Sequence, residues 1–207
     1  MNGFLITRVN YDKATRYLYA WCEELLQLAK KNWRTYELSR VKANRKNVES
    51  YLKKQSPSLA IFNGHGNAGA VLGHDNEELI SVTYRNEDLL AGKKVFIRAC
   101  TAGSLLGKNI RAKGAIGFIG YKIPFVFWHD PTTNLSHPLK DPDAEPFRKC
   151  SNQIGISLLK GHTVREAHNL SIKTYQKVIA ELLTSDSKRS YLVPELIANM
   201  RNQVCYD

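Results

Sequence analysis

The segment "SLAIFNGHGNAGA" (residues 58–70) places a histidine, His65, between two glycines directly after a run of apolar residues. A second segment, "KKVFIRACTAGS" (93–104), has the same design, with Cys100 at the end of its apolar run. Continuous apolar runs bounded by glycine are typical of strands that are covered on both faces of a parallel sheet. The two segments therefore predict strands at 58–63 and 93–100, whose ends carry a histidine and a cysteine.

The first 120 residues alternate between strand-like and helix-like patterns. Besides the two strands above, short β-rich runs predict strands at 3–9, 35–39 and 115–121. Helical spacing of apolar residues predicts helices at 13–31, 44–56 and 103–114. Strand–helix alternation predicts the α/β class, with a mostly parallel twisted sheet of five to six strands and helices on both faces.

The second half of the sequence follows a different pattern. Residues 129–147 hold four of the seven prolines and predict a long surface loop. Helical periodicity returns at 144–160, 163–183 and 191–201, and the second of these helices opens with a capping box, Thr163 and Glu166. We expect a single domain over residues 1–207, with a Pro-rich loop at 129–147 and a helical part at 148–207.

The composition limits the partners. Lysine and arginine number 30 against 19 acidic residues, but the basic residues are spread along the chain. A solvated basic surface explains this better than a dedicated nucleic-acid surface. No apolar run approaches the roughly 20 residues that cross a bilayer, and the start does not resemble a signal peptide, so we expect no membrane association. The sequence leaves the oligomeric state open.

The four cysteines are widely separated and form no CxxC pair. A chain of 207 residues needs no disulfide framework, so we expect free thiols in a reducing cytoplasm. No His/Cys cluster has the spacing of a zinc site, so we expect no metal and no cofactor.

His65 and Cys100 together predict a chemical site. In a sheet of this kind, ligands bind beyond the carboxyl ends of the strands. If the two strands are neighbours, about 4.8 Å apart, both side chains emerge at one edge. A nearby imidazole can take the proton of a thiol, and the amino end of the helix at 103–114 favours the thiolate. The N–H groups of Gly66 and Cys100 would then form a two-donor oxyanion hole.

These motifs resemble the caspase–gingipain clan of cysteine peptidases, which includes the CHAT peptidases. The resemblance is carried by Asn63-Gly64-His65-Gly66, by Ala99-Cys100 and by "GAIGFIGY" (114–121), and it covers roughly residues 3–121. It implies a caspase-like fold with a flavodoxin-like strand order. It also implies a cysteine endopeptidase that hydrolyses peptide bonds through a thioester, with Cys100 as nucleophile and His65 as acid and base.

The resemblance also implies a specificity pocket. In the clan, the residue two positions before the nucleophile lines that pocket, and here it is Arg98. A guanidinium pairs well with a carboxylate, so the hypothesis is cleavage after an acidic residue. Asp12 follows the first strand and has three open interpretations: a pocket residue, a partner that neutralises Arg98, or the N-cap of the helix at 13–31. Asp75 is a further residue that could orient His65, although an ordinary Asp-Asn turn is the better explanation.

Three alternatives to a peptidase remain open from the sequence. The chain could be a catalytically inactive relative that serves as a binding module. It could be a flavodoxin-like protein for small ligands, although "VNYDKAT" (9–15) stands where a glycine-rich phosphate loop would be expected. It could also bind nucleic acid through its basic surface, which a steep salt dependence would reveal.

Overall fold

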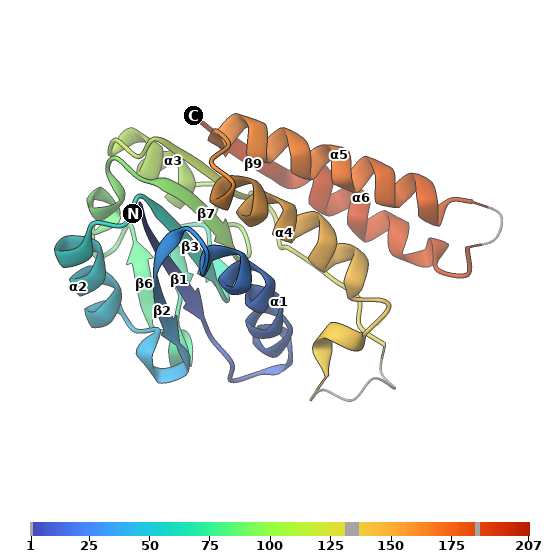
Figure 1. Cartoon of the computed structure of the whole chain (residues 1–207), viewed down its shortest axis with the longest axis horizontal. Coiled ribbons are helices and arrows are strands. Elements are labelled where there is room, and N and C mark those ends of the chain that lie inside the picture. The colour runs from blue at the N-terminus through green and yellow to red at the C-terminus, as the bar shows by residue number, and fades with distance from the viewer. Residues whose placement is uncertain (1, 131–136, 185–186) are drawn as a thin grey trace.

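The computed structural model describes residues 2–130, 137–184 and 187–207. A six-stranded sheet forms its centre (Figure 1), with the order β2-β1-β3-β7-β8-β9. The strands of this sheet are β1 (Asn2–Arg8), β2 (Trp33–Ser39), β3 (Leu59–Asn63), β7 (Lys94–Arg98), β8 (Gly117–Tyr121) and β9 (Gln203–Tyr206). The helices are α1 (Lys13–Ala29), α2 (Arg45–Gln55), α3 (Leu106–Ala112), α4 (Glu145–Leu159), α5 (Val164–Leu182) and α6 (Val193–Asn202).

The strand directions confirm the predicted fold class. The first five strands of the sheet run parallel, in the flavodoxin-like order that the sequence predicts. β9 is antiparallel and pairs with β8 at the edge of the sheet. The sequence pattern does not predict β9, because this strand has four residues, which are too few for a periodicity to show.

Two hydrophobic layers cover the faces of the sheet. Successive strand side chains point to opposite faces, so Phe4, Ile6 and Phe96 pack on one side with residues of α1, α4, α5 and α6. Leu5 and Ile97 pack on the other side with residues of α2 and α3. Both faces are therefore buried, which explains why the parallel strands have continuous apolar runs.

The segment between β3 and β7 forms a second, small antiparallel sheet, in the order β4-β5-β6. Its strands are β4 (Gly66–Asn67), β5 (Ala70–Leu72) and β6 (Glu78–Ser81). Val71, Leu79 and Ile80 are buried in the same hydrophobic cluster as α2 and α3. The sequence predicts only an excursion from the edge of the main sheet here, because strands of two to four residues carry no clear alternation.

The helical second half follows its predicted boundaries closely. Residues 131–136 of the predicted Pro-rich loop lie outside the described residues. α4 begins at Glu145, one residue after the start of the helix predicted at 144–160. The end of the predicted loop at 129–147 is therefore helical. Thr163 and Glu166 form the predicted capping box at the start of α5. α5 packs along α4, and α6 lies beside α5 (Figure 1). No helix in the described ranges is both long and apolar enough to cross a bilayer.

Candidate active site

The register of β3 and β7 brings the His65 and Cys100 segments to one edge of the sheet. Asn63, the last residue of β3, pairs with Arg98, the last residue of β7. His65 and Cys100 each lie two residues beyond these strand ends. The paired strands themselves are about 4.8 Å apart. A Cβ added to Gly66 would lie only 3.3 Å from the carbonyl oxygen of Cys100, so the two segments are in contact beyond the strand ends.

Cys100 lies in a sharp turn that two other strands hold in place. β7 ends two residues earlier than predicted, and Thr101 has a left-handed backbone with φ of 52°. That conformation costs a residue with a side chain about 1–2 kcal/mol, so neighbouring contacts have to impose it. Gly103 donates its N–H to the Tyr121 carbonyl at 2.8 Å and accepts a hydrogen bond from the Tyr206 hydroxyl at 2.8 Å. Ser104 closes the turn by donating its N–H to the Thr101 carbonyl at 2.9 Å.

The surroundings of the Cys100 thiol do not favour its anion. Burial raises the pKa of the thiol, although the N–H groups of Phe125 and of Cys100 itself act in the opposite direction. The predicted contribution of a following helix is wrong, because α3 begins only at Leu106 and has seven residues. A raised pKa means that the thiol keeps its proton at neutral pH, so a base has to take the proton when the sulfur reacts.

Asp12 holds His65 and caps α1 at the same time. Its Oδ2 lies 2.5 Å from Nε2 of His65, and its Oδ1 accepts the N–H of Thr15 at 2.8 Å. Burial acts to raise the pKa of Asp12, but the hydrogen bonds from Thr15 and His65 outweigh it and lower the pKa. A carboxylate on Nε2 of a neutral imidazole selects the Nε2–H tautomer, which leaves Nδ1 as the basic nitrogen.

The N-cap interpretation of Asp12 is therefore confirmed, and its contacts leave no role for it as a neutralising partner of Arg98. The side chains of His65 and Asp12 are 37% and 40% exposed, so the pair is open to solvent. Asp75 is not the residue that orients His65, because its carboxylate lies near His74, at 3.5 Å.

Tyr11 packs against the imidazole, a contact that no sequence pattern predicts. Its ring centre lies 5.9 Å from that of His65 and 5.9 Å from that of His74. Its hydroxyl donates to Asn76 Oδ1 at 2.8 Å, which ties the ring to the turn between β5 and β6. Only its position directly before Asp12 could have drawn attention to it in the sequence.

Arg98 does not line a substrate pocket, contrary to the prediction from the sequence. The side chain is fully buried and packs with its Cζ 5.4 Å from the centre of the Trp21 ring. Its Nε donates to Asn63 at 3.0 Å, and its Nη1 donates to Ser151 at 2.9 Å and to Asn152 at 2.7 Å. Strand alternation turns Arg98 toward α1 and α4, so a peptide at the sheet edge cannot reach it, and the acidic preference loses its basis.

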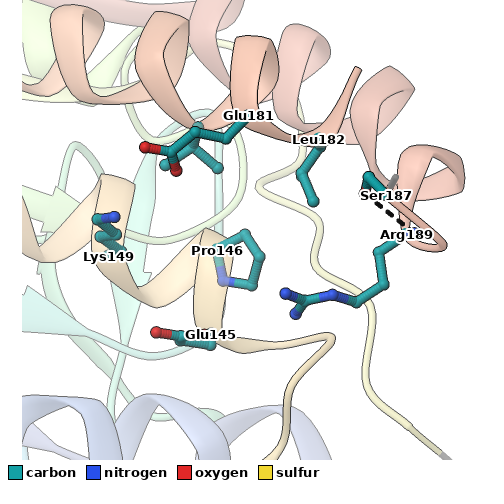
Figure 2. Close-up of a pocket in the computed structure, with 8 residues that line it drawn as sticks. Glu145, Pro146, Lys149, Glu181, Leu182, Ser187 and Arg189 are labelled. Atoms are coloured by element: carbon teal, nitrogen blue, oxygen red, sulfur yellow. Dashed lines mark hydrogen bonds between the residues drawn. The ribbon is translucent and has the colours of Figure 1, made fainter. Parts of the chain in front are cut away.

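Two pockets on the surface differ in their position relative to the candidate site. One of about 300 Å³ is lined by Lys13, Ala14, Phe125, Val126, Phe127 and His129, and it adjoins both Asp12 and the loop that contacts Cys100. The other, of about 170 Å³, lies between the start of α4 and the end of α5 (Figure 2). Glu145, Lys149, Glu181 and Arg189 give it mixed charge, and neither helix carries a residue of the candidate site.

A metal centre has no obvious place in the described ranges, where no three His, Cys, Asp or Glu side chains come together. The expectation that the protein uses no metal or cofactor stays a prediction.

Comparison with known proteins confirms the fold. No family model matches the sequence, and no curated protein matches it. Among solved structures, the complex of the pro- and mature domains of RgpB from Porphyromonas gingivalis aligns with 98% of this chain at a TM-score of 0.61 and 12% identity. The aligned part covers 46% of the RgpB chain.

A second structure, caspase-1 from Spodoptera frugiperda, aligns with 99% of this chain and 84% of its own length at 12% identity. Its TM-score of 0.47 is too low to support a conclusion. The gingipain alignment, together with the strand order above, shows that the chain has a caspase-like fold. At this level of identity the comparison shows the fold alone.

Proposed function

We propose that the protein is a cysteine endopeptidase with Cys100 as nucleophile and His65 as acid and base. The observation that carries the proposal is the placement of both residues at one sheet edge, with His65 held by the carboxylate of Asp12. The caspase-like fold supports it, since the site lies beyond the carboxyl ends of two central strands. The remaining parts of the proposal follow from the chemistry of these side chains.

In the first half of the reaction, His65 takes the proton from the Cys100 thiol as the sulfur attacks the peptide carbonyl carbon. The carbonyl π electrons move to the oxygen, giving a tetrahedral oxyanion. His65 then gives its proton to the amide nitrogen, the C–N bond breaks, and the amine product leaves a thioester on Cys100. In the second half, His65 deprotonates a water that attacks the thioester, and the sulfur leaves and regains the proton as the acid product departs.

The backbone supplies the groups proposed to bind the oxyanion. Leu72 donates its N–H to the His65 carbonyl at 2.9 Å, and Gly66 pairs with Val71 in the same ladder. In this pattern Gly66 and Val71 form a pair that exchanges no hydrogen bonds, so the ladder does not use the Gly66 N–H. We assign this N–H and that of Cys100 to the oxyanion, where each such donor is worth about 3 kcal/mol of barrier stabilisation.

Asp12 is proposed as a positioning residue and not as a substrate ligand. Its hydrogen bond to Nε2 sets the tautomer and fixes the ring plane, and its negative charge stabilises the imidazolium that forms during the reaction. This role replaces the earlier hypothesis that Asp12 binds substrate, because both carboxylate oxygens are already engaged.

The proposal is tested by covalent labelling of the full chain with a peptidyl ketone that alkylates thiols, followed by mass spectrometry. We expect one modification, at Cys100, which is absent in Cys100→Ala and slowed by at least about 100-fold in His65→Ala. Cys205 is the matched internal control, because it is also partly exposed and its pKa is raised to about 11. Equal labelling of both cysteines, or unchanged labelling in His65→Ala, would contradict the proposal.

A second candidate function is an inactive relative that binds peptides without cleaving them. The raised pKa of Cys100 favours it, because a partly buried neutral thiol reacts slowly. The same experiment separates the two candidates. An inactive binder would show no selective labelling of Cys100 but would bind a ketone-free peptide with the same affinity in the protein and in Cys100→Ala.

A further inference from the structure

The pocket of about 300 Å³ beside the candidate site has a defined relation to the reactive sulfur. Phe125 lines the pocket, and its backbone N–H lies close enough to the Cys100 sulfur to act against the rise in the pKa of that thiol. On the opposite wall, Lys13 and Ala14 directly follow Asp12, which holds His65. The pocket therefore opens between the two elements that touch the dyad.

The walls of this pocket are preformed. Phe127 packs against Tyr17 at 5.4 Å and against Trp21 at 4.9 Å between ring centres. Val126 is fixed through its backbone, because its N–H donates to Asn199 Oδ1 at 3.1 Å and its carbonyl accepts from Asn199 Nδ2 at 2.6 Å. A pocket with fixed walls binds its occupant without the entropy cost of ordering them.

The chemistry of the lining selects the occupant. Ala14, Phe125, Val126 and Phe127 present apolar surface, and among the six described residues that line the pocket the only full charge is the amine of Lys13. A carboxylate or ammonium placed among these rings would lose its hydration without a partner deep in the pocket. Lys13 and the formal net charge of +11 act against a basic occupant in particular.

We propose that this pocket receives an aliphatic or aromatic side chain from the substrate residue immediately before the cleaved bond. This inference rests on the proposed peptidase function. The sulfur attacks the carbonyl carbon of that residue, so its side chain lies nearest to Cys100 and to the loop carrying Phe125. The protein then cleaves after large apolar residues, and not after the acidic residues that Arg98 first indicated.

The test uses four thiol-reactive ketones, acetyl-Ala-Ala-X acyloxymethyl ketones with Leu, Phe, Asp or Lys as X, on the full chain. The rate of Cys100 labelling is measured by mass spectrometry. We expect the Leu and Phe probes to react at least about tenfold faster than the Asp and Lys probes, because the pocket discriminates by burial of apolar surface.

Two variants link any preference to this pocket. Val126 is 38% exposed, and its fixed contacts are made by its backbone, so Val126→Asp leaves them in place. We expect this variant to raise the Lys-to-Leu rate ratio by at least about tenfold. Val41→Asp, at a residue that is 65% exposed and lies outside the pocket, is the matched control and leaves the ratio unchanged. If Val126→Asp does not fold, Ala14→Leu is the second pocket variant. It fills the pocket from the side of α1, and we expect it to slow the reaction of the Phe probe.

The outcomes separate this inference from the proposed function. If Cys100 is labelled but the Asp or Lys probe reacts fastest, or if neither pocket variant changes the ratio, the specificity assignment is wrong and the peptidase proposal stands. If no probe labels Cys100, both are overturned.

Discussion

At the scale of single residues, Asp12 joins two functions that are normally separate. One carboxylate oxygen caps α1 and the other holds His65. The lowered pKa of Asp12 keeps it ionised well below neutral pH, so its contribution to stability is present above the ordinary aspartate pKa and is lost as pH falls through the lowered value. Both functions therefore persist at neutral pH.

Asp12→Asn separates the two functions. Asparagine caps helices as well as aspartate does, so we expect the melting temperature to change little. Its single oxygen cannot serve both Thr15 and His65, and it carries no charge to stabilise an imidazolium, so peptide turnover should fall by roughly 10- to 1000-fold. Asp12→Ala is the control that should lose both turnover and about 1 kcal/mol of stability. Full activity in Asp12→Asn would show that His65 needs no carboxylate.

Arg98 is predicted to stabilise the fold and not to select substrate. Arg98→Met removes a buried cation and leaves the oxygens of Asn63, Ser151 and Asn152 without their donor. We expect the free energy of unfolding, measured in urea, to fall by about 2–4 kcal/mol. The relative rates for acidic and apolar peptides should stay the same in any folded fraction. A selective loss of acidic-peptide cleavage would return Arg98 to the substrate pocket.

The sequence predicted the placement of His65, Cys100 and Gly66 because it depends only on strand ends and parallel pairing. The contact of Asp12 with His65 was harder to predict, because the two residues are 53 positions apart. Whether they meet depends on where both side chains point, which the sequence pattern does not show. The burial of Arg98 was missed for a related reason. Alternation gives a side chain one of two faces, but it does not say which helices cover that face.

At the scale of elements, the fit of α3 against the sheet depends on the absence of a side chain at one position. A Cβ added to Gly107 would lie 2.4 Å from the ring of Phe118. That ring cannot easily move, because it stacks on Tyr206 with ring centres 5.9 Å apart and also lies under Gly120. Close packing of α3 on β8 therefore requires glycine at the second position of this helix.

Gly107→Ala should destabilise the protein although alanine is the better helix former. The gain in helix propensity is at most about 1 kcal/mol in the first turn of a helix, and the clash with a fixed ring costs about 1–3 kcal/mol in such cores. We expect a net loss in thermal unfolding experiments. Lys108→Ala, on the exposed side of the same helix, is the control and should stay within about 0.5 kcal/mol. An increase in stability for Gly107→Ala would show that α3 is free to shift.

The long elements of the fold were predictable, and the short ones were not. α1, α4 and α5 have enough turns for an apolar stripe to show, and their boundaries agree with the sequence to within two residues. The strands of the small sheet and β9 have two to four residues, which is too few to distinguish a strand from a loop. Their positions depend on tertiary packing.

At the scale of the whole molecule, one buried and one partly buried thiol link stability to pH. Burial raises the pKa of Cys150 to about 12, and it raises the pKa of Cys205 to about 11. The unfolded chain releases these protons near the ordinary cysteine value, while the folded chain retains them. Their contribution to stability is therefore complete below that value and is lost as pH rises toward the raised values.

The free energy of unfolding should fall between pH 9 and pH 10. Most tyrosine side chains ionise above this range, at about pH 10 and higher. The expected slope is up to about 1.4 kcal/mol per pH unit for each buried thiol. Cys150→Ala should lower stability at neutral pH through its cavity but should show a shallower slope above pH 9. Urea unfolding at several pH values measures both. An identical slope in the variant would mean that the Cys150 thiol does not control this loss.

The pairing of β3 with β7 has a consequence for recognising distant relatives of this chain. The offset of 35 between Asn63 and Arg98 is the same as that between His65 and Cys100, so hydrogen-bonded pairing, and not chain length, fixes which residues meet. The connection between the two strand ends can therefore be longer or shorter in a relative without changing which residues meet. Searches with a fixed gap between the histidine and the cysteine would overlook such homologues, whereas aligning the two strand ends would retain them.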